Sequence, residues 1–82
     1  TMQIEIRFLS SLRETTGTNT LTLDVPEASR LSDAVDMLLV QFPELSGHQS
    51  MWHFAVNLTV VEQDKVLKSG DVVAIFPHIA GG

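Results

Sequence analysis

The residues with the clearest chemical potential are the last six of the sequence, Pro77-His78-Ile79-Ala80-Gly81-Gly82. Six residues in extended form reach about 20 Å, so such a tail can enter a pocket on another protein. Gly81 and Gly82 lack a Cβ, which lets the backbone pass a narrow channel and adopt torsions closed to other residues. They also leave the carboxylate of Gly82 sterically open to attack on ATP and then to attack by a nucleophile. The pattern predicts a flexible functional tail over residues 77–82.

A terminal Gly-Gly also occurs at frayed chain ends that have no function, and the dipeptide alone favours that interpretation. The context favours a function. Pro77 lacks a backbone N–H and should end the pairing of the apolar strand that precedes it. Ile79 and Ala80 are poor residues for a solvated end and suit a groove on a partner.

The remaining residues predict no catalytic centre and no metal site. Cysteine is absent, which excludes thiolate catalysis, iron–sulfur clusters and cysteine zinc sites. His48 and His53 are too isolated for a metal site, and His78 is interpreted as a tolerated substitution in the tail. Trp52 is as suited to cover the edge of the core as to touch a partner. We therefore predict that the chain binds no metal or cofactor and supplies no acid or base.

Composition limits the size and setting of the protein. Its 82 residues suffice for one core, so residues 1–82 are predicted to form a single domain, with Thr1 interpreted as the remnant of an expression tag. The net charge of -5 argues against nucleic acid as a partner. No apolar run approaches the roughly 20 residues of a membrane span, and no secretory signal pattern is present. Together with the absence of cysteine, these features predict a cytoplasmic protein that does not bind membranes.

Hydrophobic periodicity predicts the elements that must hold the tail. Short apolar runs, most of them alternating, predict strands at 3–9, 20–25, 53–56, 59–61 and 71–76. An apolar stripe at helical spacing predicts a helix from Leu31 to Phe42, capped by Ser29 or Ser32 and ended by Pro43.

Shorter signals fill the connections. Ser11 and Glu14 predict a capping box for a short helical turn that ends at Gly17. Residues 44–51 read as a surface connection, and Asn57-Leu58 predicts a tight turn. The run 71–76 is nearly all apolar, as expected of a strand buried in the centre of a sheet.

The order of these elements predicts the fold class. One helix must cover one face of the sheet, because neither element can bury its apolar side alone. A crossover through the helix allows the first and last strands to lie adjacent and parallel. We expect an α+β protein of the β-grasp, or ubiquitin-like, type. It has a mixed sheet of four to five strands packed on one main helix, followed by an extended C-terminal tail.

The carboxyl-terminal third resembles the ending of the small subunit of molybdopterin synthase, a ubiquitin-like sulfur carrier. The segment from Leu67 to Gly82 has the Gly-Asp turn, the apolar strand, the Phe-Pro step and the Ala before Gly-Gly that are typical of this family. His78 stands where the family usually has a second proline. Weaker resemblance covers the rest of the chain, at Phe8, Leu9, Leu12-Arg13-Glu14, Gly17 and Ala55-Val56-Asn57.

The resemblance implies a carrier that is not catalytic on its own. An adenylyltransferase of the ubiquitin-activating type would adenylate the Gly82 carboxylate with ATP and Mg²⁺. Sulfur from a donor such as a cysteine desulfurase or a rhodanese would convert it to a thiocarboxylate. The tail, from Pro77 to Gly81, would then enter the active site of the large subunit within a heterotetramer and give sulfur to a cyclic pyranopterin precursor. Phe76, Leu9 and Arg13 are expected to contact that subunit.

Three alternatives stay open. A sulfur carrier for thiamine, cysteine or tRNA thiolation would use the same activation chemistry with a different acceptor. A ubiquitin-like modifier would attach Gly82 to lysines as an isopeptide. An interaction module with an accidental ending is disfavoured by the Phe76-Pro77 junction and the tail composition.

Overall fold

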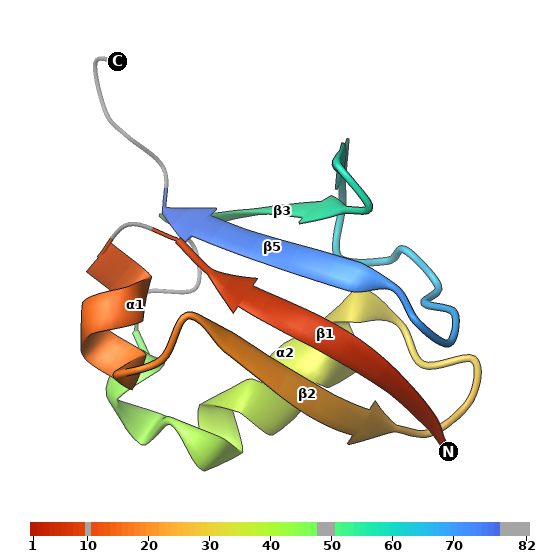
Figure 1. The fold of residues 1–82 in the computed structure, drawn as a ribbon, viewed down its shortest axis with the longest axis horizontal. Coiled ribbons are helices and arrows are strands. Elements are labelled where there is room, and N and C mark those ends of the chain that lie inside the picture. Colours follow the sequence, from red (N-terminus) through yellow and green to blue (C-terminus); the bar gives the residue numbers. More distant parts are fainter. Residues whose placement is uncertain (10, 48–50, 78–82) are drawn as a thin grey trace.

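The computed structural model describes residues 1–9, 11–47 and 51–77. Its strands form one five-stranded sheet in the order β2-β1-β5-β3-β4 (Figure 1). The elements in chain order are β1 (Met2–Phe8), α1 (Ser11–Thr16), β2 (Thr20–Val25), α2 (Leu31–Gln41), the 3-10 helix η1 (Pro43–Leu45), β3 (Trp52–Val56), β4 (Thr59–Val61) and β5 (Val72–Pro77). Each predicted strand and the main helix are present within one or two residues of their expected bounds.

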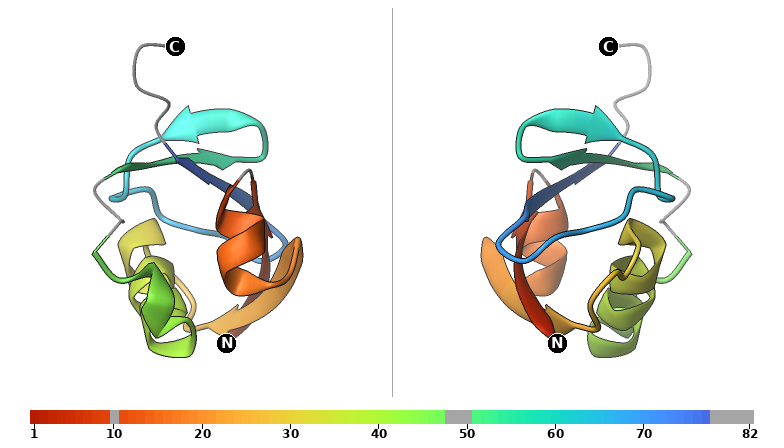
Figure 2. Two further views of the ribbon diagram at one scale, coloured as in Figure 1. Left: turned by 90° about the vertical axis from the view of Figure 1, so that its left-hand side faces the viewer. Right: turned by 90° about the vertical axis from the view of Figure 1, so that its right-hand side faces the viewer.

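The sheet is mixed, and its central pair is parallel. β1 lies beside β5 in parallel register, from Glu5 opposite Val72 to Phe8 opposite Ile75. The β1–β2, β3–β4 and β3–β5 pairs are antiparallel. Figure 2 shows α2 against one side of the sheet, where it forms the crossover that a parallel pair requires. This arrangement confirms the predicted α+β, ubiquitin-like β-grasp fold.

The core lies between α2 and the sheet face turned toward it. Alternate residues of β1, namely Ile4, Ile6 and Phe8, are buried there. The predicted apolar stripe of α2 packs against them, with Leu31 and Leu38 fully buried and the later stripe residues partly buried. The ring of Phe8 meets that of Phe42 edge-on, with centroids 5.8 Å apart. The apolar side chains that recur every two residues in β1 therefore pack against those that recur at helical spacing in α2, and together they form one apolar layer.

The last strand lies in the centre of the sheet, as predicted, but it is fully buried on one face only. In β5, Val73 and Ile75 are buried, but Val72, Ala74 and Phe76 are only half-buried. The reason is that α2 covers a single face, so the opposite face of the central strand stays accessible.

Pairing also continues one residue further than predicted, because Pro77 lies opposite Trp52 in register with β3. Proline lacks only the donor N–H. It is tolerated here because it is the last residue of β5, beyond the point where the neighbouring β1 ends at Phe8.

The predicted helix caps are wrong as well. Ser11 is the first residue inside α1 and not its cap. The N-cap of α2 is Arg30, whose backbone N–H donates to the Asp33 carboxylate at 2.9 Å. Ser29 instead donates its hydroxyl to the Pro26 carbonyl at 2.6 Å.

Backbone carbonyls satisfy the start of α2. The N–H of Leu31 donates to the Lys65 carbonyl at 2.8 Å, and that of Ser32 donates to the Gln63 carbonyl at 2.9 Å. The first N–H groups of a helix have no hydrogen-bond partner within the helix. The segment that follows β4 supplies the acceptors that a serine N-cap was predicted to supply.

The predicted surface connection after α2 contains a core residue. Leu45, in η1, is only 1% exposed. Pro43 begins this 3-10 turn, and the tight turn directs Leu45 inward between α1 and β3. Residues 48–50 of the same connection lie outside the described part of the chain.

The predicted turn between β3 and β4 is confirmed, with positive φ angles at Asn57 (51°) and Leu58 (72°). Asn57 also ties this turn to the start of β5. Its Nδ2 donates to Oδ1 of Asp71 at 3.0 Å, and the second oxygen of Asp71 accepts from the backbone N–H of Lys68 at 2.8 Å. Asp71 is 8% exposed, so its carboxylate belongs to a largely dry network.

We expect Asp71→Ala to lower the free energy of unfolding by about 1–3 kcal/mol, because it leaves the Asn57 amide and the Lys68 N–H without their acceptors. Urea denaturation measures the change. Asp24→Ala is the matched control, since Asp24 is an exposed carboxylate on β2 and its removal should change stability by no more than about 0.5 kcal/mol. Equal losses in the two variants would show that the network does not stabilise the protein.

Candidate functional site

The strand β5 ends at Pro77, which is also the first residue of the predicted tail. β5 is the central strand, paired with β1 on one side and β3 on the other. Its residues Val73 and Ile75 are anchored in the core, which fixes the position of Phe76 and Pro77. We call these two residues the tail root. The predicted tail residues His78, Ile79, Ala80, Gly81 and Gly82 lie outside the described residues, so their roles stay predictions.

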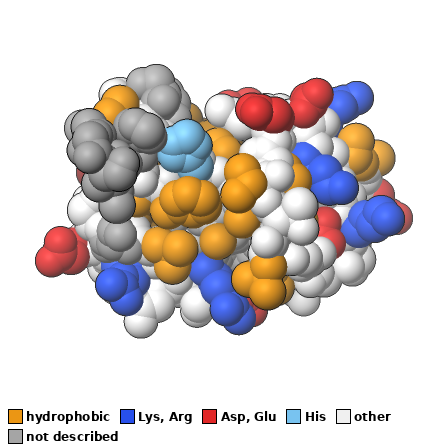
Figure 3. Space-filling model, turned by 90° about the horizontal axis from the view of Figure 1, so that it is seen from above, with side chains coloured by type: hydrophobic (Ala, Val, Ile, Leu, Met, Phe, Trp, Pro, Cys, Tyr) orange, Lys and Arg blue, Asp and Glu red, His pale blue; other side chains and the backbone are white. Residues whose placement is uncertain are grey.

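The sheet face turned away from α2, which we call the open face, is apolar beside the tail root. Phe76 lies on this face, with its ring stacked on that of His53 at a centroid distance of 5.8 Å. Leu9 continues β1 alongside it, because the Leu9 N–H donates to the Ile75 carbonyl at 3.1 Å. Leu9 is 39% exposed. Figure 3 looks onto this face and shows hydrophobic side chains gathered beside a histidine.

A shallow hollow of about 460 Å³ extends the open face away from the tail root. Small or aliphatic residues make up most of its lining, which consists of Arg7, Leu9, Ala55, Asn57, Leu58, Val72 and Ala74. Arg7 contributes a cation, but its Nε lies 2.5 Å from the Glu5 carboxylate. This pair leaves the hollow without a net charge, so the open face is suited to apolar contact with another protein.

The structure brings together two of the three residues predicted for the partner interface. Leu9 and Phe76 are neighbours on the open face. Arg13 lies on α1, where its side chain is exposed, and it is not among the residues that line the hollow. Sequence reasoning could not place Arg13, because it gave no orientation for α1 relative to the sheet.

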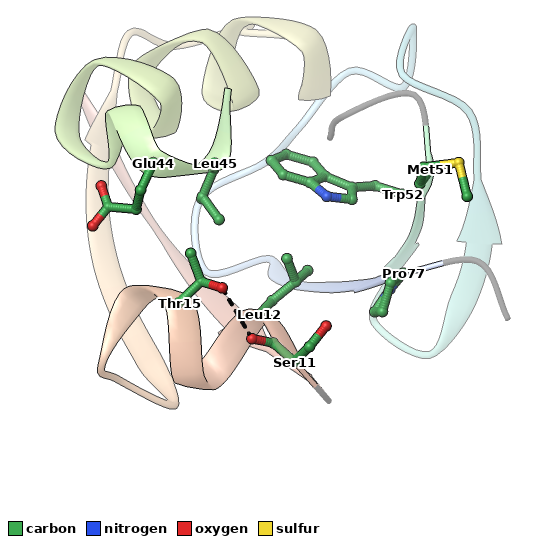
Figure 4. A pocket seen from close by; sticks show the side chains of 8 residues that line it. All are labelled: Ser11, Leu12, Thr15, Glu44, Leu45, Met51, Trp52 and Pro77. Atoms are coloured by element: carbon green, nitrogen blue, oxygen red, sulfur yellow. Dashed lines mark hydrogen bonds between the residues drawn. The ribbon is translucent and has the colours of Figure 1, made fainter. Parts of the chain in front are cut away.

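A cavity of about 240 Å³ lies at the tail root on the opposite side of the sheet. Figure 4 shows Leu12, Leu45 and Trp52 pointing toward the space between α1, η1 and β3, with Pro77 at its edge. The full lining is Ser11, Leu12, Thr15, Glu44, Leu45, Met51, Trp52 and Pro77. We call this the tail-root cavity. Sequence analysis missed it, since it placed Leu45 in a surface loop. The Phe-Pro step at 42–43, which starts the 3-10 turn, is the signal that could have revealed it.

The described residues do not assemble the usual parts of a metal centre or a membrane anchor. Within 1–9, 11–47 and 51–77, no three His, Asp or Glu side chains form a group that could hold a metal ion. The helices of that same part of the chain are all too short or too polar to cross a membrane. What these residues offer is a rigid strand end flanked by two apolar surfaces.

Sequence comparison relates almost the whole chain to known proteins. Residues 6–82 match the ThiS family. A protein of Chlamydomonas reinhardtii named molybdopterin synthase sulfur carrier subunit is 34% identical over 83 residues, which cover 99% of this chain and 100% of that protein. One of the same name from Arabidopsis thaliana is 31% identical over 81 residues, covering 99% of this chain and 84% of the relative.

Solved structures share the fold at lower identity. A candidate molybdopterin converting factor subunit 1 from Pyrococcus furiosus superposes with a TM-score of 0.88 at 22% identity, covering 96% of this chain and 100% of that chain. The small archaeal modifier protein 1 of Haloferax volcanii gives 0.87 at 23% identity, with the same coverage. A chain from the complex of subunits 1 and 2 of the Helicobacter pylori molybdopterin-converting factor gives 0.72 at 21% identity, covering 99% and 100%.

Proposed function

The chain belongs to the ThiS family, and from this premise we propose that it is a ubiquitin-like sulfur carrier that serves as the small subunit of a molybdopterin synthase. The observation that carries the proposal is the full-length similarity to proteins named as that subunit. The geometry supports it, because the residue before the predicted tail segment 78–82, Pro77, is the last residue of the central strand β5. A cytoplasmic setting is part of the proposal.

The proposed chemistry takes place at the Gly82 carboxyl group. One carboxylate oxygen attacks the α-phosphorus of ATP, which is held with Mg²⁺ by an activating adenylyltransferase, and pyrophosphate leaves. The terminal sulfur of a persulfide on a donor enzyme then attacks the acyl carbon and displaces AMP. A thiol breaks the sulfur–sulfur bond and leaves a thiocarboxylate on Gly82.

Sulfur delivery follows inside the large subunit. The tail, from Pro77 to Gly82, enters the active site of that subunit, and the thiocarboxylate sulfur is transferred to a cyclic pyranopterin precursor. Water supplies the oxygen that restores the carboxylate. In this scheme the partners provide the acids, bases and metal ion, while this chain provides reach and an open carboxyl group.

Intact-mass spectrometry tests the proposal. The full chain is incubated with an activating adenylyltransferase, ATP, Mg²⁺ and a persulfide donor. We expect a mass gain equal to the replacement of one oxygen atom by sulfur, dependent on ATP. No gain under conditions that load a known sulfur carrier would contradict the proposal.

A ubiquitin-like modifier is the second candidate, and the close structural match to an archaeal modifier protein favours it. Both candidates share the adenylation step. They differ in the product, because a modifier forms an isopeptide with a lysine of another protein. The same mass assay, run in the presence of candidate target proteins, separates the thiocarboxylate from the conjugate.

We propose that Leu9 and Phe76 bind the large subunit at the base of the tail, and that Arg13 pairs with an acidic group on it. We expect Phe76→Ala to raise the dissociation constant of that complex by about 10- to 100-fold, because a buried aromatic anchor is typically worth that much in an interface. Isothermal titration calorimetry with the purified large subunit measures the change.

Val40→Ala is the matched control for this prediction. Val40 is 82% exposed on α2, on the far side of the sheet from the open face, so its truncation should leave the affinity unchanged. If Phe76→Ala bound as tightly as the control variant, the open face would not be the interface.

A further inference from the structure

We propose that the free protein forms a two-fold symmetric dimer through its open face, in which Leu58 of one copy fills the hollow of the other. The occupant of the hollow is thus a second copy of this chain. Three features of the described residues carry the inference. They are an exposed leucine that neither its turn nor the core requires, an apolar hollow beside it, and a charge pattern that is complementary to its own two-fold image.

Leu58 is unusual in both its backbone and its exposure. Its φ angle is 72°, in the left-handed region where a bulky side chain is uncommon and where glycine or asparagine is favoured. The residue is 99% exposed, so it contributes nothing to the core. Backbone strain of this kind is retained most often at functional positions. Contact with another molecule therefore explains a leucine here better than the turn or the core does.

The hollow beside Leu58 has a floor of small side chains. Ala55 on β3 and Ala74 on β5 lie opposite each other in register, and both line the hollow. Its volume of about 460 Å³ admits an aliphatic side chain, which would be removed from water there. A face that carries a protruding apolar residue next to an apolar hollow matches itself after a two-fold rotation, because each copy then fills the hollow of the other.

The strand register gives the position of the two-fold axis. Ile6, Val73 and Val56 lie side by side on β1, β5 and β3, and their side chains are buried on the α2 side. We place the axis across the sheet at this level, perpendicular to the strands. Such an axis reverses the strand direction in the second copy. On the open face, a residue one position after this level then lies over a residue one position before it.

This axis brings Leu58 to the hollow. Ala74 of one copy lies over Val72 of the other, and Ala55 lies over the turn at Asn57 and Leu58 of the other. The floor of each hollow therefore faces the protruding leucine of the second copy. Because the relation is reciprocal, both hollows are filled at once.

The same axis pairs opposite charges. Glu5 and Arg7 lie on either side of Ile6, so Arg7 of each copy lies over Glu5 of the other. Within one chain, the Nε of Arg7 already lies 2.5 Å from the Glu5 carboxylate, and the four groups alternate in sign. Among the described residues that line the hollow, Arg7 alone is charged. Asp33 and Asp36 are exposed on α2, on the other side of the sheet, where their charges do not oppose the contact.

Dimerisation has a consequence for partner binding. Leu9 lines the hollow and also belongs to the surface proposed for the large subunit, so the dimer and that complex exclude each other. Strand reversal places the two tail roots at opposite ends of the dimer. This consequence rests on the proposed function, whereas the dimer itself does not.

Sedimentation equilibrium of the full chain, from micromolar to millimolar concentrations, tests the proposal. We expect a monomer–dimer equilibrium. Leu58→Asn should raise the dimer dissociation constant by at least about tenfold, as loss of a central apolar anchor does, without loss of stability, because asparagine suits the positive φ. Val40→Asn is the matched control. It places the same amide at an exposed aliphatic position on α2 and should leave the dissociation constant unchanged. Urea denaturation checks that each variant is folded.

Charge reversal tests the assigned axis. Arg7→Glu and Glu5→Arg should each weaken the dimer by at least about tenfold, because each places like charges together twice across the axis. The double variant should regain the affinity of the parent, since its charges again alternate. General repulsion between acidic chains predicts the opposite for Glu5→Arg, which makes the net charge less negative and would then strengthen association.

A monomer mass across the whole concentration range would overturn the proposal. A dimer that Leu58→Asn leaves unchanged, or that Val40→Asn weakens, would also overturn it, because the contact would then lie elsewhere. So would a double charge variant that dimerises no better than the single variants. All samples contain the free chain alone, so a failure of the sulfur-carrier proposal in the mass assay leaves these results unaffected.

Discussion

Adding one alanine after Gly82 is expected to reduce thiocarboxylate formation in the intact-mass assay by more than about 100-fold, to the background of the assay. The reacting carboxyl group would move by one residue, about 3.3–3.6 Å, relative to a body that stays bound in the same place. Misplacement of a reacting group by about 1 Å already costs on the order of 100-fold in rate.

The new terminal residue also carries a Cβ next to the acyl carbon, where Gly82 has none. One alanine added before Thr1 is the control, because it changes the mass of the chain equally and leaves the tail unaltered. Full loading of the extended chain, with its mass showing that the alanine has not been trimmed, would refute the assignment of Gly82 as the activated residue.

This expected sensitivity to one added residue follows from the fixed position of the end of β5. Phe76 and Pro77 are held in register opposite His53 and Trp52 of β3, so the point where the tail leaves the sheet is fixed. The length from that point to the carboxyl group is then set by the sequence alone. A sliding register would make the reach variable, and the alternating burial of β5 opposes such a slip because it would turn Ile75 out of the core.

The fold was predictable from sequence because its periodicities are strong. Ile4, Ile6 and Phe8 alternate in β1, and the stripe that begins at Leu31 has helical spacing, so the element types and the buried faces followed directly. The parallel pairing of β1 with β5 followed from the single intervening helix.

The errors arose where tertiary contacts outweighed local preference. Ser29 is a good N-cap residue, yet Arg30 occupies the cap because the carbonyls of Gln63 and Lys65 bind the first helical N–H groups. These acceptor carbonyls belong to a segment more than 30 residues away in sequence, so no local sequence pattern could indicate them. Serine is a preferred N-cap residue, but a preference of that kind takes no account of acceptors from distant parts of the chain.

The candidate site was predicted in part, for a similar reason. Leu9 and Phe76 were predicted from the family resemblance and from their nearness to the tail, and the structure places them together on the open face. Arg13 depends on how α1 is oriented, and the tail-root cavity depends on Leu45 turning inward from η1. Both are properties of packing between elements, and they became visible only when α1, η1 and β3 were brought together.

The second large effect is expected for a substitution on the buried side of β5. We expect Ile75→Ala to lower the free energy of unfolding by about 2–5 kcal/mol, through lost apolar burial and the cavity left behind. Ile75 is 1% exposed, and its neighbours in register are Phe8 on β1 and Phe54 on β3. A protein of 82 residues has a total stability of roughly 4–12 kcal/mol, so this single change removes a large share of it. Urea denaturation monitored by circular dichroism measures the loss.

Val60→Ala is the control, because it also truncates a branched aliphatic side chain to alanine, but at an exposed position. Val60 is 70% exposed on β4, so its truncation should change stability by no more than about 0.5 kcal/mol. Because Ile75 lies two residues before Pro77, the last residue of β5, truncation of its side chain should also loosen the strand end that precedes the proposed tail. Sulfur loading by Ile75→Ala should therefore fall as temperature approaches its lowered midpoint, while Val60→Ala keeps the behaviour of the parent. Equal stability of the two variants would show that the core does not fix the end of β5, and the tail would then have no rigid base from which to act.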